Sequence, residues 1–428
     1  MTVDPGTGVE PREEAAAVAV DETGQTLSAA DQTLSGYIRR WWQKVRGGDL
    51  GSLPIVVGLV VIVIVFGSLN DTFLTERNFT NLLLQMAPYA TLAIGIVFVL
   101  LIGEIDLSIA FVSAVGGVVM TLLIRPDDPG LPWFVAVAAA LAATMIIGFL
   151  HALIITKAGV PSFVVTLAGL LIWSGVVLYL MTEATTTGTI RIQEPTIVGI
   201  ANNFLSDAWG VVVGVLVVAG YALSQLQTAR SRRAGGLDAK PASLLGLQVI
   251  GLAAVTFFAV WYANLDRGVP TVTVILGLFI VFWTFVASRT RFGRHVYAVG
   301  GNPEAARRAG INVDRVRIAV FMINGFMAGV GGIIIASRLR SVATSSGGGD
   351  LLLNVIAAAV IGGTSLFGGI GRVVSALLGA LVIASIDSGM NLLGLSQGLK
   401  FIITGLVLLG AVLIDALSKR SRTARGVA

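Results

Sequence analysis

Two polar segments lie between long apolar runs, and their side chains are the ones best suited to handle a polar solute. The first segment is Leu101-Ile-Gly-Glu-Ile-Asp-Leu-Ser108, which carries two carboxylates. The second segment is Ile361-Gly-Gly-Thr-Ser-Leu-Phe-Gly-Gly-Ile-Gly371, whose glycines let a helix unwind. Carboxylates and unwound backbone at membrane depth indicate a transport pathway. For the glycines, close packing of helices by small residues is the alternative.

A third polar group lies nearer the end of the chain. Asp387 and Asn391 are four residues apart, so they share one helix face, beside Ser385 and Ser388. Such side chains line a polar path or hydrogen-bond between helices. The predicted candidates for a translocation pathway are Glu104, Asp106, Ser108, Thr364, Ser365, Asp387 and Asn391.

Two of these candidates have a purely structural interpretation. Asp106 could cap a span that begins at Leu107, and Ser108 could cap one that begins a residue later. His151, alone in an apolar run, is interpreted as a packing residue and receives no role.

No catalytic residue and no metal site are predicted. The chain has no cysteine and only two histidines, His151 and His295, which makes a thiolate or histidine metal centre improbable. It lacks the Gly-x-x-x-x-Gly-Lys loop that binds nucleotide phosphates, so we expect no ATPase activity and no cofactor bound by this chain. No nucleophile and base converge in the sequence, which leaves an intramembrane enzyme as a remote alternative.

The composition predicts that these residues are positioned by membrane-spanning helices. Hydrophobic residues make up 55% of the 428, charged residues make up 12%, and the mean hydropathy is +0.88. The apolar residues form long continuous runs, which favours helices over a barrel of short alternating strands. The expected fold is an all-α, polytopic integral membrane bundle of about 12 helices. The predicted spans are 51–69, 79–103, 107–124, 132–156, 160–182, 209–226, 244–262, 269–288, 318–337, 351–367, 373–393 and 397–414.

The distribution of charge predicts the topology. The net charge of +5 comes from Lys and Arg in short loops, a topology signal and not a nucleic-acid site. We expect a multi-pass protein of the cell membrane with both termini in the cytoplasm. The predicted regions are a disordered tail at 1–36, an interfacial anchor at 37–50, a transmembrane domain at 51–417 and a C-terminal tail at 418–428. Arg338, Arg340 and Asp350 are predicted outside, as a docking surface or a solvated loop.

The longest basic connection, at 289–317, contains a short predicted helix. Pro303 stands at the first helical position, Glu304 in the first turn, Arg307 and Arg308 late, and Gly310 at the end. A charged surface helix of this kind in a transporter is suited to docking into a partner protein.

This connection resembles the coupling loop of the ribose/xylose/galactose-type sugar ABC permeases, which inserts into an ATP-binding subunit. The matching residues are Gly300, Gly301, Asn302, Glu304, Ala305, Ala306, Arg307, Gly310 and Ile311. Four more stretches match in the same order: 103–108, 161–167, 354–365 and 389–394. The sequence departs from the commoner family pattern at Ser108-Ile-Ala110, where many members have Ser-Val-Gly. The runs at 209–226 and 244–262 exceed the ten-helix family core and resemble the longer xylose-type members.

The resemblance implies the permease subunit of a bacterial ABC importer for a simple sugar, with xylose favoured. It also implies an ATP-binding subunit that holds ATP and Mg, an extracytoplasmic sugar-binding protein and a permease homodimer in the lipid membrane. Two alternatives stay open at this point. One is an ion-coupled secondary sugar transporter that uses Glu104 and Asp106, and the other is a branched-chain amino acid ABC permease.

Overall fold

The computed structural model describes Gly36, Arg39, Trp42 and residues 53–126, 130–235 and 240–424. The first helices are α2 (Leu53–Leu69), α3 (Glu76–Leu101), α4 (Ile109–Leu123), α5 (Trp133–Leu153), α6 (Ser162–Ala184), α7 (Pro195–Asn202), α8 (Asp207–Ala234) and α9 (Ala242–Asn264). The remaining helices are α10 (Thr271–Arg289), α11 (Arg291–Gly301), α12 (Pro303–Arg308), α13 (Val313–Leu339), α14 (Leu351–Ile361), α15 (Val373–Leu392) and α16 (Gln397–Ala424). The short strands β1 (Thr189–Arg191) and β2 (Ser341–Ala343) pair antiparallel.

Within the described residues, eight helices are long and apolar enough to cross a membrane, and four shorter ones are also apolar. Each corresponds to one of the predicted spans, so the all-α membrane fold is confirmed. The predicted tail at 1–36 and anchor at 37–50 lie outside the described residues, apart from Gly36, Arg39 and Trp42.

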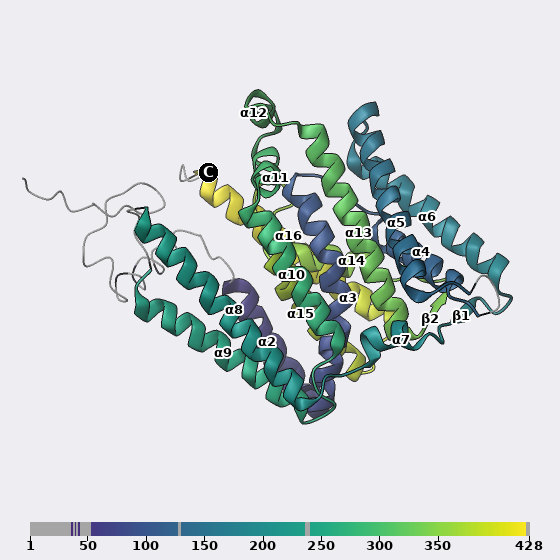
Figure 1. The fold of residues 1–428 in the computed structure, drawn as a ribbon, viewed down its shortest axis with the longest axis horizontal. Coiled ribbons are helices and arrows are strands. Elements are labelled where there is room, and N and C mark those ends of the chain that lie inside the picture. Colours follow the sequence, from purple (N-terminus) through teal and green to yellow (C-terminus); the bar gives the residue numbers. More distant parts are fainter. Residues whose placement is uncertain are drawn as a thin grey trace, which may run out of the picture. The chain divides into compact units, whose positions relative to one another are not determined.

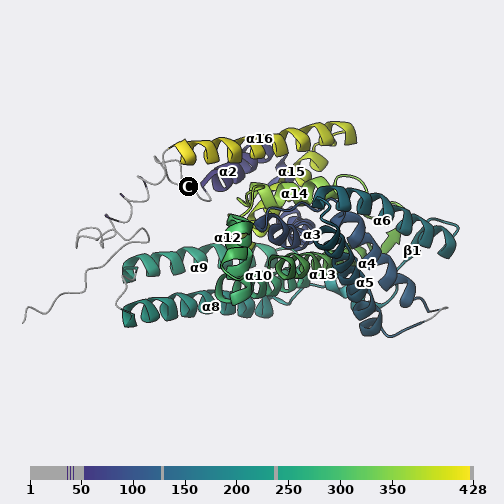
Figure 2. The ribbon, with the colours of Figure 1, turned by 90° about the horizontal axis from the view of Figure 1, so that it is seen from above.

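Helix α3 is the centre of the larger of two compact units, which contains 48–210 and 260–428. It packs against α10, α13, α14 and α15, and Figure 2 shows it enclosed by them. Its last two turns are apolar on every side and buried, as expected of a helix surrounded by other helices.

Helix α13 crosses α4 and α5 at close range because small residues line the crossing. A Cβ added at Gly332 would overlap the carbonyl oxygen of Ser113 on α4. A Cβ at Gly325 would overlap that of Thr144 on α5. The two predicted explanations for glycine, close packing and interruption, therefore apply to different parts of the chain.

Several predicted boundaries are wrong. The span predicted at 351–367 stops at Ile361, because the chain bends into its glycine-rich segment there. Helix α13 begins at Val313 and not at 318, since Asn312 caps it by accepting from the Arg315 N–H at 2.9 Å. Helix α16 continues to Ala424, beyond the end of the span predicted at 397–414.

Residues 211–259 belong to the second compact unit. They comprise most of α8 and α9, the pair of helices predicted to exceed the family core. The beginning of α8 lies against the end of α9, since the space beside Gly214 is filled by Thr256 and Phe257. The pair is therefore antiparallel.

Candidate coupling loop and solute pathway

The predicted coupling helix is present as α12. Pro303 occupies its first turn, and the side chain of Asn302 caps it by accepting from the Ala305 N–H at 3.0 Å. Glu304 and Arg307 form an ion pair of 2.7 Å, and their side chains are 71% and 54% exposed. Ala306 on the opposite face is buried. The helix thus presents a charged, accessible face and is anchored on the other. Figure 1 shows α11 and α12 at one end of α13, with α7, β1 and β2 at the other.

Helix α11, which the sequence analysis did not predict, joins this loop to both interrupted segments. Gly300 lies so close to Leu101 that an added Cβ would overlap its carbonyl oxygen and approach the Gly369 nitrogen. The Gly369 N–H donates to the same Leu101 oxygen at 2.9 Å. Gly369 has φ of +74°, a conformation that favours glycine. The end of α3, the coupling loop and the glycine-rich segment therefore meet in one backbone contact.

Tyr297 on α11 adds a side-chain contact to this junction. Its hydroxyl donates to the Gly371 carbonyl at 2.8 Å. Burial raises the pKa of this phenol, and the nearby positive charge of Arg372 offsets part of the increase. The hydroxyl therefore keeps its proton, and its role as donor, at neutral pH.

Both carboxylates of the first polar segment have partners. Glu104 forms an ion pair of 2.9 Å with Arg317 on α13. Asp106 is buried and accepts from the Ser108 N–H at 2.7 Å, the Ser108 hydroxyl at 2.6 Å and the amide of Asn324. Ser108 is the N-cap residue of α4, but its side chain makes no capping bond. Asp106 therefore organises the turn before α4 and links it to α13, in place of capping a helix at Leu107.

The glycine-rich segment places Thr364 and Ser365 at the same end of the bundle. Both are buried. Ser365 accepts from the Phe367 N–H at 3.2 Å, whereas the Thr364 hydroxyl has no hydrogen-bond partner within the described part of the chain. Five of the seven pathway candidates thus lie near the junction with α11.

Asp387 and Asn391 belong to a different polar group, which also contains residues that the sequence analysis missed. The Asn391 amide donates to the Asp387 carboxylate at 3.4 Å, which confirms that they share a helix face. The Tyr89 hydroxyl on α3 donates to the same carboxylate at 3.4 Å, and Asn354 on α14 donates to the Tyr89 oxygen at 3.4 Å. In the sequence, Tyr89 is a polar side chain within an apolar run, and this feature could have marked it as a candidate.

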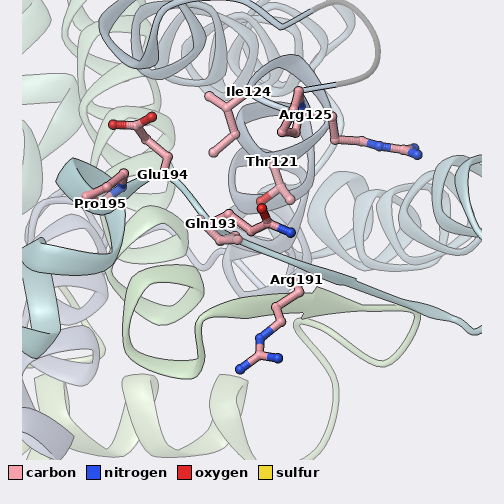
Figure 3. Close-up of a pocket in the computed structure, with 9 residues that line it drawn as sticks. Thr121, Ile124, Arg125, Arg191, Gln193, Glu194 and Pro195 are labelled. Atoms are coloured by element: carbon pink, nitrogen blue, oxygen red, sulfur yellow. The ribbon is translucent and has the colours of Figure 1, made fainter.

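A cavity of about 180 Å³ lies at the end of the bundle opposite α12. Its lining consists of Thr121, Ile124, Arg125, Pro126, Arg191, Ile192, Gln193, Glu194 and Pro195. Thr121 and Gln193 point toward one another, while Arg125 and Arg191 extend away from them (Figure 3). The Arg125 guanidinium donates to the Ala184 carbonyl at 3.0 Å, so α6 helps to fix this rim.

Neither arginine that was predicted outside lies in a free loop. Arg338 is in the last turn of α13 and half-buried. Arg340 takes the left-handed conformation at the end of that helix, with φ of 54°, and donates to the Asn202 side chain at 3.2 Å. The strand that follows pairs with β1, a contact that sequence periodicity did not predict. His151 accepts from the Trp173 indole at 3.1 Å and is buried, as expected of a packing residue.

The sequence of this chain is similar to those of known transport proteins. Residues 78–413 match the family described as branched-chain amino acid transport system / permease component. The xylose transport system permease protein XylH of Escherichia coli strain K12 is 36% identical over 87% of this chain and 93% of its own length. Its counterpart in Haemophilus influenzae is 35% identical over 88% and 99%. The ribose import permease protein RbsC of Escherichia coli strain K12 is 33% identical over 90% and 98%. No solved structure gives a significant match.

Proposed function

The chain belongs to the family of branched-chain amino acid transport system permease components, and from this premise we propose that it is the membrane subunit of an ABC importer for a pentose, with xylose favoured. The relatives named for xylose and ribose match it over nearly their whole length, which favours a sugar over an amino acid. As a transport subunit, the chain moves its solute without altering it.

The observation that carries this proposal is the position of α12. It exposes Glu304 and Arg307, while the preceding helix contacts the end of α3 and the glycine-rich segment through Gly300. A separate subunit that binds ATP and Mg and also binds α12 would move the end of α3 and the glycine-rich segment together. This chain itself then needs no bound cofactor.

The proposed function predicts which side of the membrane each end of the bundle faces. The end with α12 faces the cytoplasm, together with the N- and C-termini of a protein in the inner or plasma membrane. The end with β1, β2 and the cavity beside Arg125 faces outward, where a sugar-binding protein would dock. A permease homodimer would carry two ATP-binding subunits.

The test is reconstitution of the permease with its ATP-binding subunit and binding protein in proteoliposomes. Glu304→Lys reverses a charge on the exposed face and removes the ion pair with Arg307. We expect it to lower ATP turnover stimulated by loaded binding protein at least tenfold, with sugar uptake falling equally. Arg230→Glu, a charge reversal at an exposed residue of α8 outside the coupling loop, is the matched control.

Two results would contradict the proposal. One is unchanged stimulated turnover in the Glu304→Lys complex. The other is accumulation of D-xylose by the permease alone under a proton or sodium gradient without ATP, which is the behaviour of an ion-coupled secondary transporter.

A further inference from the structure

Four helices bring polar side chains together halfway along α3, away from the coupling loop. Tyr89 precedes Leu101 by twelve residues, which corresponds to about 18 Å along a helix. Asn354 lies in the first turn of α14, and Asp387 lies on α15. Arg338 is in the last turn of α13, at the end opposite α12. This group is therefore spatially separate from the junction around Gly300.

The hydrogen bonds within this group are long. Asn354 to Tyr89, Tyr89 to Asp387 and Asn391 to Asp387 each measure 3.4 Å, whereas N–H···O bonds cluster at about 2.9–3.0 Å and O–H···O bonds at about 2.7–2.8 Å. Lys400 makes the exception, because its ammonium donates to the Asn391 side-chain oxygen at close range. The side chains face one another without closing into a tight network. They therefore retain donors and acceptors that can form hydrogen bonds with a ligand.

Arg338 and Gln85 add unused hydrogen-bonding capacity to the group. The Arg338 charge interacts electrostatically with Tyr89 and Asp387, yet among the described residues no ion pair or hydrogen bond satisfies it. Gln85 is one helical turn before Tyr89 on the same face, and its buried side-chain oxygen has no hydrogen-bond partner in the part of the chain that the structure describes. Unpaired polar groups at membrane depth are unfavourable unless a ligand completes them.

We propose that Gln85, Tyr89, Arg338, Asn354 and Asp387 form a binding site for a polyhydroxylated neutral ring as it crosses the permease. This proposal rests on the proposed function and names where the sugar is held. Each sugar hydroxyl both donates and accepts, so it can donate to Asp387 or Gln85 while it accepts from Arg338 or Asn354. Asp387 and Arg338, together with the nearby charges of Asp350 and Lys400, add no net charge, which is compatible with an uncharged solute.

A pentose offers several hydroxyls to this group, whereas a branched aliphatic side chain would leave the Gln85 oxygen without a partner. The ammonium and carboxylate of an amino acid could pair with Asp387 and Arg338, so the preference for a pentose rests on the relatives named for xylose and ribose.

The experiment uses the complete complex in proteoliposomes and measures D-xylose transported per ATP hydrolysed. The variants are Asp387→Asn, Arg338→Gln and Tyr89→Phe. Thr91→Val and Ser385→Ala are matched controls on α3 and α15, because each hydroxyl donates to a carbonyl of its own helix and, among the described residues, to no other helix. We expect the sugar-to-ATP ratio to fall about tenfold in Asp387→Asn and Arg338→Gln and less in Tyr89→Phe. The controls should keep the wild-type ratio.

An unchanged ratio in all three variants overturns the proposal, whether or not total activity falls, because a merely structural role lowers transport and ATP turnover together. If one variant fails to assemble, the other two decide. Failure of the proposed function is distinct, because the wild-type complex itself would then show no ATP-dependent uptake.

Discussion

The charges next to the helix break illustrate how single residues stabilise an interrupted helix. Glu104 and Arg317 are only 13% and 25% exposed and lie 2.9 Å apart. Removing one partner leaves the other partly desolvated, whereas removing both leaves no unpaired charge. Glu104 and Asp106, the carboxylates that an ion-coupled transporter would use, are therefore both tied to α13.

We expect Glu104→Gln and Arg317→Gln each to destabilise the purified permease by about 1–3 kcal/mol, while the double variant loses less than the sum. Thermal unfolding followed by tryptophan fluorescence gives the double-mutant cycle. Additive losses would show that the ion pair has no coupling energy.

The junction of α11 with α3 and the glycine-rich segment shows how elements communicate. The contact is made by backbone atoms, which cannot rearrange by changing rotamer. A displacement of the coupling loop must therefore move the ends of both interrupted helices or break the contact.

Gly300 and Gly301 provide a matched pair of substitutions for this junction. A Cβ at Gly300 meets the Leu101 carbonyl, whereas one at Gly301 meets nothing within 4 Å. Gly300→Ala should destabilise the isolated permease by about 1–3 kcal/mol through overpacking. Gly301→Ala should be neutral or slightly stabilising, by up to about 1 kcal/mol. Equal melting temperatures for the two variants would show that the junction accommodates a Cβ at Gly300 without loss of stability.

At the scale of the whole molecule, residues 211–259 are a unit added to a permease core. The adjoining residues are close, since Gly210 lies against Val260. A short linker between them would remove two crossings, which preserves the direction of every later helix.

Replacing 211–259 by a short Gly/Ser linker should leave a folded permease. Its melting temperature should change by less than about 4 °C, roughly the effect of 1 kcal/mol in a domain of this size. Circular dichroism of the purified protein and ATP-dependent uptake by the complex are the measurements. Loss of membrane insertion would show that the core depends on this helix pair.

The sequence predicted what the bilayer and local chemistry determine. Continuous apolar runs located the spans, and Asn302 with Pro303 located α12, because caps act within a few residues. Pairing over long distances was not predictable. The β1–β2 contact pairs Ile190 with Val342, 152 residues apart, and the meeting of Tyr89 with Asn354 and Asp387 depends on how helices pack. The early end of α14 was also missed, because its glycines were included in an apolar run.

The short helix α14 has a consequence for hydration. Its 11 residues cover about 17 Å of an apolar layer about 30 Å thick, and the glycine-rich backbone continues the path. The Gly369 amide is occupied by Leu101, so separating α3 from this segment requires water to take over that bond. Deuterium uptake at Gly369 during turnover would therefore report whether α3 and this segment move together or separate.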